Sequence, residues 1–447
     1  MSREITDLPI FEYGWEEDVI SGQYVSRCAA FAREHGPIFR FQVRHTAIYG
    51  VHMVGPEANR FVFHTHRQHF SHEKGWTPIV GELVGRGLLN MDDPDHAQHR
   101  SLWNPAFASE VMEGYIPVVH QIIRETLQRW SSEPEVMVHK ESQAITFDVA
   151  AAALAGITQP EHLAKLRHIF WVILHGLDGE SDITVFEQID QLQQELLSLL
   201  LGTIQARRRT PPNRDGPVSD VLSQIVHARF EDGRQLDDIE ILGHLNVLLL
   251  AGHETTTSLS AWILYLLATM PEHWDELQQE VDEVLADIAI GDEAKVPTTA
   301  QIRKLVRIDN FIKEVGRVYP PVFQVPRVTL SACEFNGVEI PAETRVRLQL
   351  AAAHQLPDVF QDPLTFDPAR FERPRREDRA TPYSLVTFGG GPRICIGISF
   401  ATIEVKVLAA QVLRHYRLSA PVNQTLLHCG HYNAVPKFDL RVAFGKR

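Results

Sequence analysis

Cysteine is scarce in this chain of 447 residues, which carries only Cys28, Cys333, Cys395 and Cys429. The four lie far apart and form no Cys-x-x-Cys pair, which argues against a disulfide framework and against a structural zinc site. A protein with neither fits a reducing compartment, so we expect it in the cytoplasm.

Long apolar runs are also missing. No segment reaches the ~18 consecutive apolar residues that a membrane-spanning helix needs. The nearest candidate, residues 242–268, is interrupted by His244, Asn246, His253 and Glu254. The N-terminus has early acidic residues and lacks the apolar core of a signal peptide. The sequence therefore predicts a soluble protein with no transmembrane anchor.

Positive charge is in deficit, since 43 Lys and Arg stand against 57 Asp and Glu and the net charge is −14. A chain this acidic is a poor partner for nucleic acid unless its basic residues are clustered. The composition is otherwise ordinary, with 44% hydrophobic and 22% charged residues, which excludes collagen-like and disordered proteins.

Neither an internal repeat nor a low-complexity linker divides the chain. Helical periodicity dominates residues 108–319, and strand-like alternation appears over 38–54 and 325–350. The polar stretch 207–217 is interpreted as a loop, and an irregular run over 356–392 precedes a final helix over 397–415. Strands from both ends of the chain can share one sheet. We therefore expect a mainly α fold with a minor β-sheet region, in a single domain over residues 1–447.

One predicted helix is unusually long. Asp237 is a candidate N-cap with Glu240 three residues later, and the helical pattern continues to Met270, where Pro271 ends it. Such a helix is roughly 50 Å long. Its middle, residues 247–252, is apolar on all sides, which is typical of a helix buried at the centre of a large fold.

A polar cluster, Gly252-His-Glu-Thr-Thr-Thr257, interrupts this apolar helix. Buried polar groups are unfavourable unless they are hydrogen bonded, so the cluster predicts either a hydrogen-bond network or a function. His253-Glu254 also begins a pattern like the zinc-protease His-Glu-x-x-His, but position 257 is Thr, so the second ligand is missing.

The segment Phe388-Gly-Gly-Gly-Pro-Arg-Ile-Cys-Ile-Gly397 places a cysteine where the final helix begins. Backbone amides, the positive end of that helix and Arg393 would stabilise a thiolate at Cys395. The alternative is an inert buried cysteine beside a glycine-rich turn. A dinucleotide-binding loop is disfavoured, because position 394 is Ile where that motif has its third glycine.

The spacing of Phe388, Gly391, Arg393, Cys395 and Gly397 resembles the ten-residue haem-binding signature of the cytochrome P450 family. Four further segments resemble motifs of that family and occur in its order. They are His96-Ala-Gln-His-Arg100, Ala251-Gly-His-Glu-Thr255, Glu314-Val-Gly-Arg317 and Phe366-Asp-Pro-Ala-Arg-Phe371. The resemblance implies the P450 fold, with the long central helix lying over a haem b.

The resemblance also implies roles for individual residues. Cys395 as thiolate would be the axial ligand of the haem iron, in a loop whose glycines let backbone amides approach the sulfur. The haem propionates need buried cations, and these roles fall to His96, Arg100, Arg327 and Arg393, with a plain salt bridge as the alternative for Arg327.

On the central helix, Thr255 and Glu254 correspond to the family's proton-delivery pair. Ala251 and Gly252 would leave space for oxygen above the iron. The alternative for a mid-helix threonine is a hydrogen bond to the preceding turn, and we prefer that alternative for Thr256 and Thr257.

The Glu-x-x-Arg pair is expected to be structural. Glu314 and Arg317 lie three residues apart on one helix face, and Arg370 would join them in a buried cluster that holds the loop before Cys395. The sequence departs from the family in one place, since His354-Gln355-Leu356 stands where a His-Arg-Asp is usual.

Histidines 64, 66, 69 and 72 form a dense group, which we interpret as a solvated face because no spacing fits a known metal site. A monooxygenase of this family needs electrons from outside, and the sequence has neither a flavin fingerprint nor an iron–sulfur spacing. A ferredoxin or flavodoxin with its reductase is therefore the expected partner. The basic run Arg370, Arg373, Arg375, Arg376 and Arg379 could dock it, or could be a solvated loop neutralised by its acidic neighbours.

The segments expected to line a substrate pocket are mostly apolar. They include residues 76–89, Leu248, Ala251, Val322 and Phe323, so the sequence favours a lipophilic substrate such as a fatty acid or a terpenoid. Two alternatives remain at this point: a peroxide-using or rearranging enzyme of the same fold, and a non-catalytic haem-binding or lipophile-binding protein.

Overall fold

The computed structural model describes residues 3–20, 22–176, 183–210, 220–290, 295–421, 424, 428–429, 435–436 and 440–447. The α-helices are α1 (Tyr24–His35), α2 (Pro56–Arg60), α3 (Glu73–Val84), α4 (Asp95–Trp103), α5 (Ser109–Met112), α6 (Ile116–Trp130), α7 (Val138–Ala155), α8 (Pro160–Gly176), α9 (Ile183–Arg209), α10 (Val221–Ile225), α11 (Asp238–Thr269), α12 (Trp274–Val284), α13 (Thr299–Lys304), α14 (Val306–Val318), α15 (Leu350–Ala353), α16 (Glu377–Ala380) and α17 (Ile398–His415).

The strands are short. They are β1 (Arg3–Glu4), β2 (Ile10–Tyr13), β3 (Ile38–Val43), β4 (Tyr49–Val54), β5 (Phe70–Ser71), β6 (Val136–Met137), β7 (Gln324–Thr329), β8 (Cys333–Phe335), β9 (Val338–Ile340), β10 (Arg345–Gln349), β11 (Tyr416–Ser419), β12 (His428–Cys429), β13 (Val435–Pro436) and β14 (Arg441–Lys446). The prediction of a mainly α fold with minor sheets is confirmed, and no described helix combines the length and apolarity needed to cross a bilayer.

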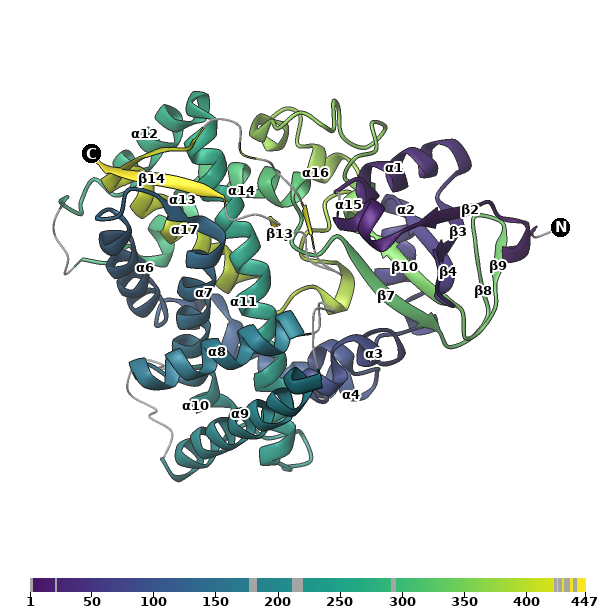
Figure 1. Cartoon of the computed structure of the whole chain (residues 1–447), viewed down its shortest axis with the longest axis horizontal. Helices are drawn as coiled ribbons and strands as arrows, with labels where there is room; N and C mark the ends of the chain where they lie inside the picture. Colours follow the sequence, from purple (N-terminus) through teal and green to yellow (C-terminus); the bar gives the residue numbers. More distant parts are fainter. Residues whose placement is uncertain are drawn as a thin grey trace.

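The largest sheet joins two distant parts of the chain. Its strand order is β2-β3-β4-β10-β7-β5, with β10 parallel to β4 and antiparallel to β7. Val346 on β10 lies opposite Val51 on β4, so the expectation that strands from both ends share a sheet is confirmed. Figure 1 shows this sheet at the N-terminal end of the molecule and the helices at the other end.

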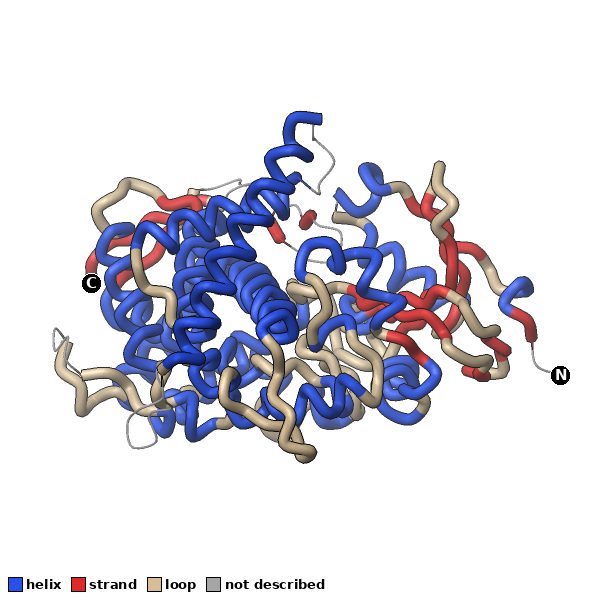
Figure 2. The backbone as a smooth tube through the Cα atoms, turned by 90° about the horizontal axis from the view of Figure 1, so that it is seen from below, coloured by secondary structure: helices blue, strands red, loops and turns tan. Residues whose placement is uncertain are grey.

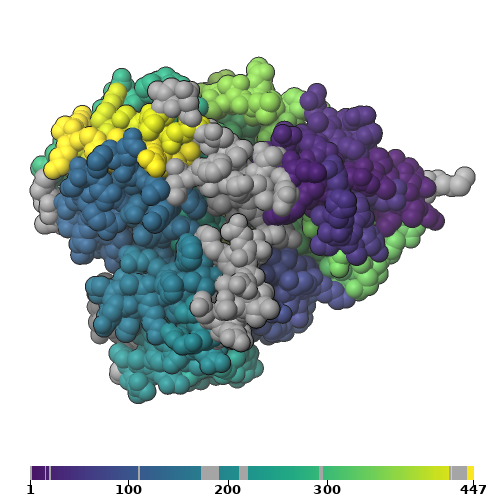
Figure 3. Space-filling model, in the orientation of Figure 1, coloured from purple at the N-terminus to yellow at the C-terminus, as the bar shows by residue number. Residues whose placement is uncertain are grey.

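The same division is visible in the other views. In Figure 2 most strands gather at the N-terminal end, beside the helices of the larger part. In Figure 3 the purple N-terminal residues lie against the green residues of the later strands. Three buried apolar clusters match this layout, one among the helices and two beneath and around the sheet.

The long central helix forms as the sequence predicts. Asp237 caps α11 by accepting a hydrogen bond from the Glu240 amide (2.7 Å), and the Glu240 carboxylate accepts one from the Asp237 amide (2.8 Å). At 1.5 Å per residue, the 32 residues of α11 span about 48 Å. Helix α17 begins at Ile398, also within one residue of the prediction.

Helix α7 packs along α11, and its alanines permit a close approach. A Cβ built at Gly252 would meet Leu154 at 3.8 Å and Ala150 at 3.9 Å, which is ordinary packing contact. Gly252 therefore faces α7. The expectation that Gly252 leaves space for oxygen stays a prediction.

Two expectations about local structure need correction. Before residue 108 the sequence predicts only strands, whereas the structure also has helices α1 to α4 there. Arg207 and Arg208 belong to the last turn of α9 rather than to a loop, because they pair with Asp220 and Asp238 at the end of the helix where cations are favoured. Residues 211–217 of that predicted loop lie outside the described residues.

Candidate functional site

The loop before α17 folds back on itself around Cys395. The Cys395 amide donates to the Phe388 carbonyl (2.9 Å), which closes the ten-residue segment. Gly389 and Gly391 have φ angles of +73° and +66°, a region that favours glycine. A Cβ at Gly391 would lie 2.1 Å from the Phe63 carbonyl oxygen, so only glycine lets this loop pack there.

Cys395 is a free thiol whose side chain has open surface. Burial nevertheless raises its pKa, while the backbone N–H of Gly397 and the charge of Arg100 act in the opposite direction. A thiol that is enclosed by protein and still has free surface faces open space inside the molecule. An amide hydrogen and a guanidinium nearby are the groups that stabilise a thiolate.

Helix α11 is buried along most of its length but has a more open stretch at its centre. Leu249 and Thr256 are buried, whereas Ala251 between them is exposed and Thr255 is half-buried. The Thr255 hydroxyl donates to the Ala251 carbonyl (2.6 Å), so Thr255 does make the hydrogen bond to the preceding turn. This bond uses the hydroxyl proton and leaves the oxygen lone pairs free to accept.

Glu254 lies next to this opening, and its side chain is 14% exposed. Its Oε1 atom is 3.1 Å from Nε2 of His253, which is buried on the side of the helix that faces α7. The acid and the hydroxyl that the sequence pairs are therefore both present on α11.

Arg327 is a buried cation with little to balance it. Its Nη1 atom donates to the Pro326 carbonyl (2.6 Å), and its Nε atom has no hydrogen-bond partner among the described residues. Burial, followed by the positive charge of Arg393, lowers its pKa to about 9, and the charge of Asp92 opposes both. The salt-bridge alternative for Arg327 has no ion pair to support it in the described part of the chain.

The other predicted cations gather around it. Arg393 lies 3.2 Å from Asp93 and donates to a backbone carbonyl, and His96 is 3.6 Å from the same carboxylate. Burial lowers the pKa of His96 to about 4, with Arg393 as the next cause. Burial also lowers the pKa of Arg100, and the Cys395 thiol opposes that shift. The structure thus brings Arg100, Arg327 and Arg393 into one electrostatic neighbourhood near Cys395, together with His96, whose lowered pKa favours the neutral ring.

His72 is half-buried and belongs to the same neighbourhood, so the sequence interpretation of it as part of a fully solvated face is wrong. Burial lowers its pKa well below the usual range, followed by the charges of Arg327, Arg393 and His96. Its backbone N–H donates to Asp92 (2.7 Å), which fixes the start of α3 beside this cluster. Sequence spacing alone could not reveal this, because the cations come from distant segments.

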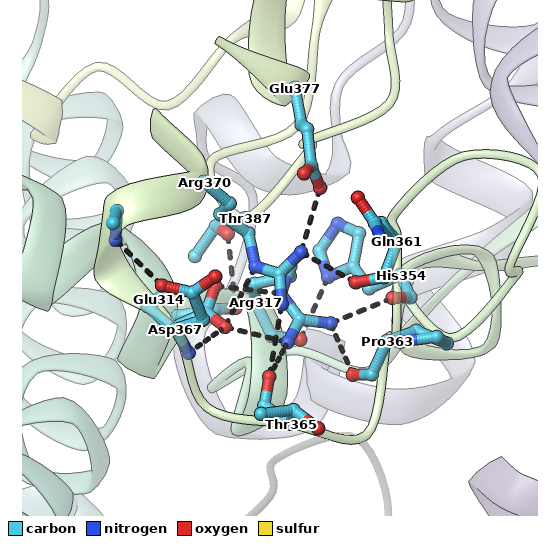
Figure 4. Close-up of polar contacts among 12 residues, drawn as sticks. Glu314, Arg317, His354, Gln361, Pro363, Thr365, Asp367, Arg370, Glu377 and Thr387 are labelled. Carbon is cyan, nitrogen blue, oxygen red and sulfur yellow. Dashed lines mark hydrogen bonds and ion pairs between the residues drawn. The ribbon is translucent and has the colours of Figure 1, made fainter. Parts of the chain in front are cut away.

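The Glu-Arg-Arg cluster forms as the sequence predicts (Figure 4). The Glu314 carboxylate is fully buried and accepts from Arg317 Nε (2.7 Å), Arg317 Nη2 (2.8 Å) and Arg370 Nε (2.9 Å). It also accepts from the Asp367 amide (2.8 Å). Glu377 pairs with Arg370 at 2.7 Å, so the cluster ties α14 to the irregular segment that precedes Cys395.

His354, which directly precedes the two positions where the sequence departs from the family, supports this cluster. Its carbonyl accepts from Arg317 (3.0 Å), and its Nε2 atom accepts from the Val386 amide (3.1 Å). Nε2 is therefore unprotonated, and Nδ1 donates to the Arg317 carbonyl (3.2 Å). Burial, followed by the charge of Arg317, lowers the pKa of His354 to about 3.

The predicted substrate-lining residues are placed differently from one another. Leu248 lies one turn before Ala251 on α11 and is 8% exposed, and Val322 is half-buried. Phe323 is buried in the core cluster beside the sheet, where its ring lies 5.7 Å from that of Tyr24. A lining role for all three stays a prediction.

The basic run before the cysteine loop is only partly free. Arg370 is buried in the cluster above, and Arg375 pairs with Asp367 and Glu377. Among the described residues, Arg373, Arg376 and Arg379 have no ion-pair partner. The arginines of this run that are available to a partner are therefore three rather than five.

The residues present fit a haem. A thiol with open surface faces the interior beside a guanidinium, and a surplus of buried positive charge lies near it, with an unpartnered Nε atom on Arg327. Buried charges are unfavourable without partners, so this cluster suits a group that brings carboxylates, as the two propionates of haem do.

Comparisons with known proteins agree with this geometry. The cytochrome P450 family model matches residues 6–429. The chain is 28% identical to a sterol 14α-demethylase from Mycolicibacterium vanbaalenii, over 81% of this chain and 80% of that protein. It is 26% identical to a β-amyrin 28-monooxygenase from Saponaria officinalis, over 82% of this chain and 74% of that protein.

A solved structure is similar over almost the whole chain. The retinoic acid-bound structure of cyanobacterial CYP120A1 superposes with a TM-score of 0.83 and 26% identity, over 99% of this chain and 100% of that one. The chain belongs to the cytochrome P450 family, and it is a monooxygenase whose cofactor is haem b.

Proposed function

We propose that this enzyme hydroxylates or epoxidises a lipophilic small molecule of the terpenoid or fatty-acid type. The observation that carries the proposal is the opening on α11, where Ala251 presents apolar surface in a helix that is otherwise mostly buried. Apolar pockets with few polar groups select lipophilic ligands. The similar proteins named for a sterol, β-amyrin and retinoic acid support a terpenoid-like substrate over a fatty acid.

In this proposal the chain's residues divide the work of binding and proton handling. Cys395 holds the haem through its sulfur, and the haem supplies the iron at which O2 is activated. Arg100, Arg327 and Arg393 hold the propionates as buried cations beside the thiol, and His96 holds them as a neutral hydrogen-bond donor.

Proton handling falls to two groups on α11. The Thr255 oxygen accepts a hydrogen bond from a water, since its own proton is used by the Ala251 carbonyl. The Glu254 carboxylate, which is 14% exposed, passes protons from the solvent side to that water.

We also propose that electrons come from a separate ferredoxin or flavodoxin with its reductase, and that the enzyme works in the cytoplasm. Three free arginines before the cysteine loop suit an acidic partner, and they stand out in a chain of net charge −14.

A spectroscopic and kinetic experiment tests the function. The reduced, CO-bound protein is expected to show the absorption of a thiolate-ligated haem. Titration with sterols, triterpenes, retinoids and fatty acids is expected to shift the oxidised spectrum with the terpenoid-like compounds at the lowest concentrations. A generic ferredoxin system with reductant should then convert the best ligand into an oxygenated product.

Other outcomes point to the alternatives. Oxidation with hydrogen peroxide but not with reductant and ferredoxin would identify a peroxide-using enzyme. Reductant consumption that ignores every ligand would identify a binding protein instead. Preferential binding of fatty acids would overturn the terpenoid-like assignment while leaving the reaction class intact.

A further inference from the structure

A cavity of about 400 Å³ lies where α5, α13, α14 and α17 meet. Figure 1 shows α13, α14 and α17 on the side of the molecule that holds the C-terminus. The volume is within the range of about 300–1,000 Å³ that small-molecule sites have. None of the lining residues is among those that we assign to haem binding or proton handling.

The walls of this cavity are largely apolar. Met112 of α5 and Ile302 of α13 are buried there, and Ile398 and Ile403 of α17 are half-buried. Val306, at the start of α14, is 57% exposed and forms an edge of the cavity that faces solvent. An apolar cavity with an open edge suits a ligand that has a hydrocarbon body.

One ion pair in the lining is balanced. Lys406 of α17 is buried, and its Nζ atom lies 2.8 Å from Oδ1 of Asp309 on α14. The other oxygen of Asp309 lies 3.2 Å from Nζ of Lys313, which also has Asp378 at 3.7 Å. Burial acts to raise the pKa of Asp309, but the charges and hydrogen bonds of Lys406 and Lys313 lower it below its ordinary value. The carboxylate is therefore ionised and is already occupied by lysines.

Arg303 of α13 adds a positive charge to the lining. It is exposed and has no ion-pair partner among the described residues. Glu280 does not line the cavity and accepts from the amides of Val306 (2.8 Å) and Arg307 (2.7 Å) instead. Arg303 and Lys406 are thus two cations against one carboxylate in the lining, within a chain of net charge −14. The surplus charge favours an anionic ligand.

A hydroxyl in the cavity wall also lacks a partner. Thr299 of α13 is 7% exposed, and its Oγ1 atom makes no hydrogen bond within the part of the chain that the structure describes. A buried hydroxyl without a partner is unfavourable, so this wall favours a ligand that brings hydrogen-bonding oxygen atoms.

We propose that this cavity binds a small amphipathic carboxylate, with its hydrocarbon body between α13 and α17 and its carboxylate beside Arg303. A neutral hydrocarbon would leave the surplus charge unbalanced, and an inorganic anion would leave the apolar walls uncovered. The bound molecule would touch Ile398 and Ser399, three and four residues after Cys395, and so would contact the first turn of α17.

The test uses octanoate as the probe and octan-1-ol as its uncharged counterpart, on the haem-loaded protein. The chain has six methionines, so a methyl-¹³C methionine spectrum contains few signals, and Met112→Leu identifies the signal of Met112 in the cavity. We expect octanoate to shift this signal saturably, and octan-1-ol to do so only at about tenfold higher concentration. The haem absorbance in the same titration reports any binding at the haem separately.

Three variants at exposed positions locate the ligand. Arg303→Glu replaces attraction by repulsion and should weaken octanoate binding about tenfold without affecting octan-1-ol. Lys304→Glu is the matched control, because Lys304 is the next residue of α13, is also exposed and does not line the cavity. It should change the octanoate affinity by less than about twofold. Val306→Trp fills the open edge and should abolish the shift with both probes.

Each result decides one part of the proposal. A saturable Met112 shift that Arg303→Glu weakens and Lys304→Glu preserves supports both the site and the ligand class. A Met112 signal that octanoate leaves unmoved, or a shift that persists in Val306→Trp, overturns the site. Equal affinity for the two probes, or an unchanged octanoate affinity in Arg303→Glu, overturns the carboxylate assignment. Failure of the proposed function is seen separately, as a wild-type enzyme that consumes no reductant.

Discussion

Replacing Glu314 tests the cluster that holds the cysteine loop, and the structure supplies the size of the effect. Its carboxylate accepts four hydrogen bonds and is 0% exposed, as is its partner Arg317. Arg370 keeps a second carboxylate, Glu377 at 2.7 Å, when Glu314 is removed. Arg317 keeps only carbonyl partners, so the unpaired buried charge falls mainly on that residue.

Breaking a buried ion pair by removing one partner costs about 3–5 kcal/mol. An unfolding entropy of about 2.1 cal/mol/K per residue gives about 0.9 kcal/mol/K for 447 residues that unfold as one unit. Glu314→Ala and Glu314→Gln should therefore lower Tm by roughly 3–5 °C. They should also lose haem, because the segment before Cys395 is released although no group that contacts haem is altered.

The assay is thermal unfolding together with the haem absorbance per protein. Glu343→Gln is the matched control, since Glu343 is 65% exposed and pairs only with Lys74 in the described chain, and it should shift Tm by less than about 1 °C. A double variant, Glu314→Leu with Arg317→Met, should be more stable than Glu314→Leu alone, because it removes the orphaned charge. Normal haem content and an unchanged Tm in Glu314→Gln would refute the reasoning.

Four further outcomes are expected. Cys395→Ser should abolish the thiolate absorption of the reduced CO complex, and an unaltered spectrum would contradict the assignment of the sulfur as ligand. Arg327→Gln should lose haem to a scavenging apoprotein about tenfold faster, since a charge-assisted hydrogen bond contributes about 1.5–3 kcal/mol. The same substitution should stabilise the haem-free protein, because it removes a buried charge without an ion-pair partner among the described residues. The pKa of His354 in the folded protein is about 3, against an ordinary 6.5, so its contribution to stability is present above pH 6.5 and is lost as the pH falls toward 3, at up to about 1.4 kcal/mol per pH unit. His354→Gln should therefore make the loss of stability with falling pH less steep between pH 6.5 and 3. An equally steep loss in the variant would assign the slope to other groups. Reversing charge with Arg373→Glu and Arg379→Glu should slow reduction by an acidic ferredoxin and weaken its salt dependence, whereas rates that ignore both changes would exclude docking at that segment.

Some elements followed directly from local patterns in the sequence. The capping box at Asp237 and Glu240, the apolar middle of the helix and the proline after Met270 are local signals, and α11 begins and ends within a residue of the prediction. The glycine spacing around Cys395 likewise defines a loop whose geometry depends on nearby backbone. Glu314 and Arg317 pair because three residues on a helix bring them to one face.

Other features depended on contacts between distant segments. Arg327, Arg393, His96 and His72 come from four separate parts of the chain, so their shared electrostatic neighbourhood, and with it the correction for His72, required the tertiary structure. Gly252 could not be assigned to the α7 side from its motif, because the direction in which a helix face points depends on what packs against it.

The sequence by itself determined the haem-thiolate chemistry, since the residues that carry it recur at fixed local spacings that the backbone must satisfy. The tertiary structure alone decided the environment of that chemistry. It placed Thr146 of α7 within 3.2 Å of the His253 ring on α11, although the two residues are 107 positions apart in the chain. The physical reason is that hydrogen-bond direction and charge balance are set by whichever groups packing brings within about 3 Å, and sequence separation carries no information on that distance.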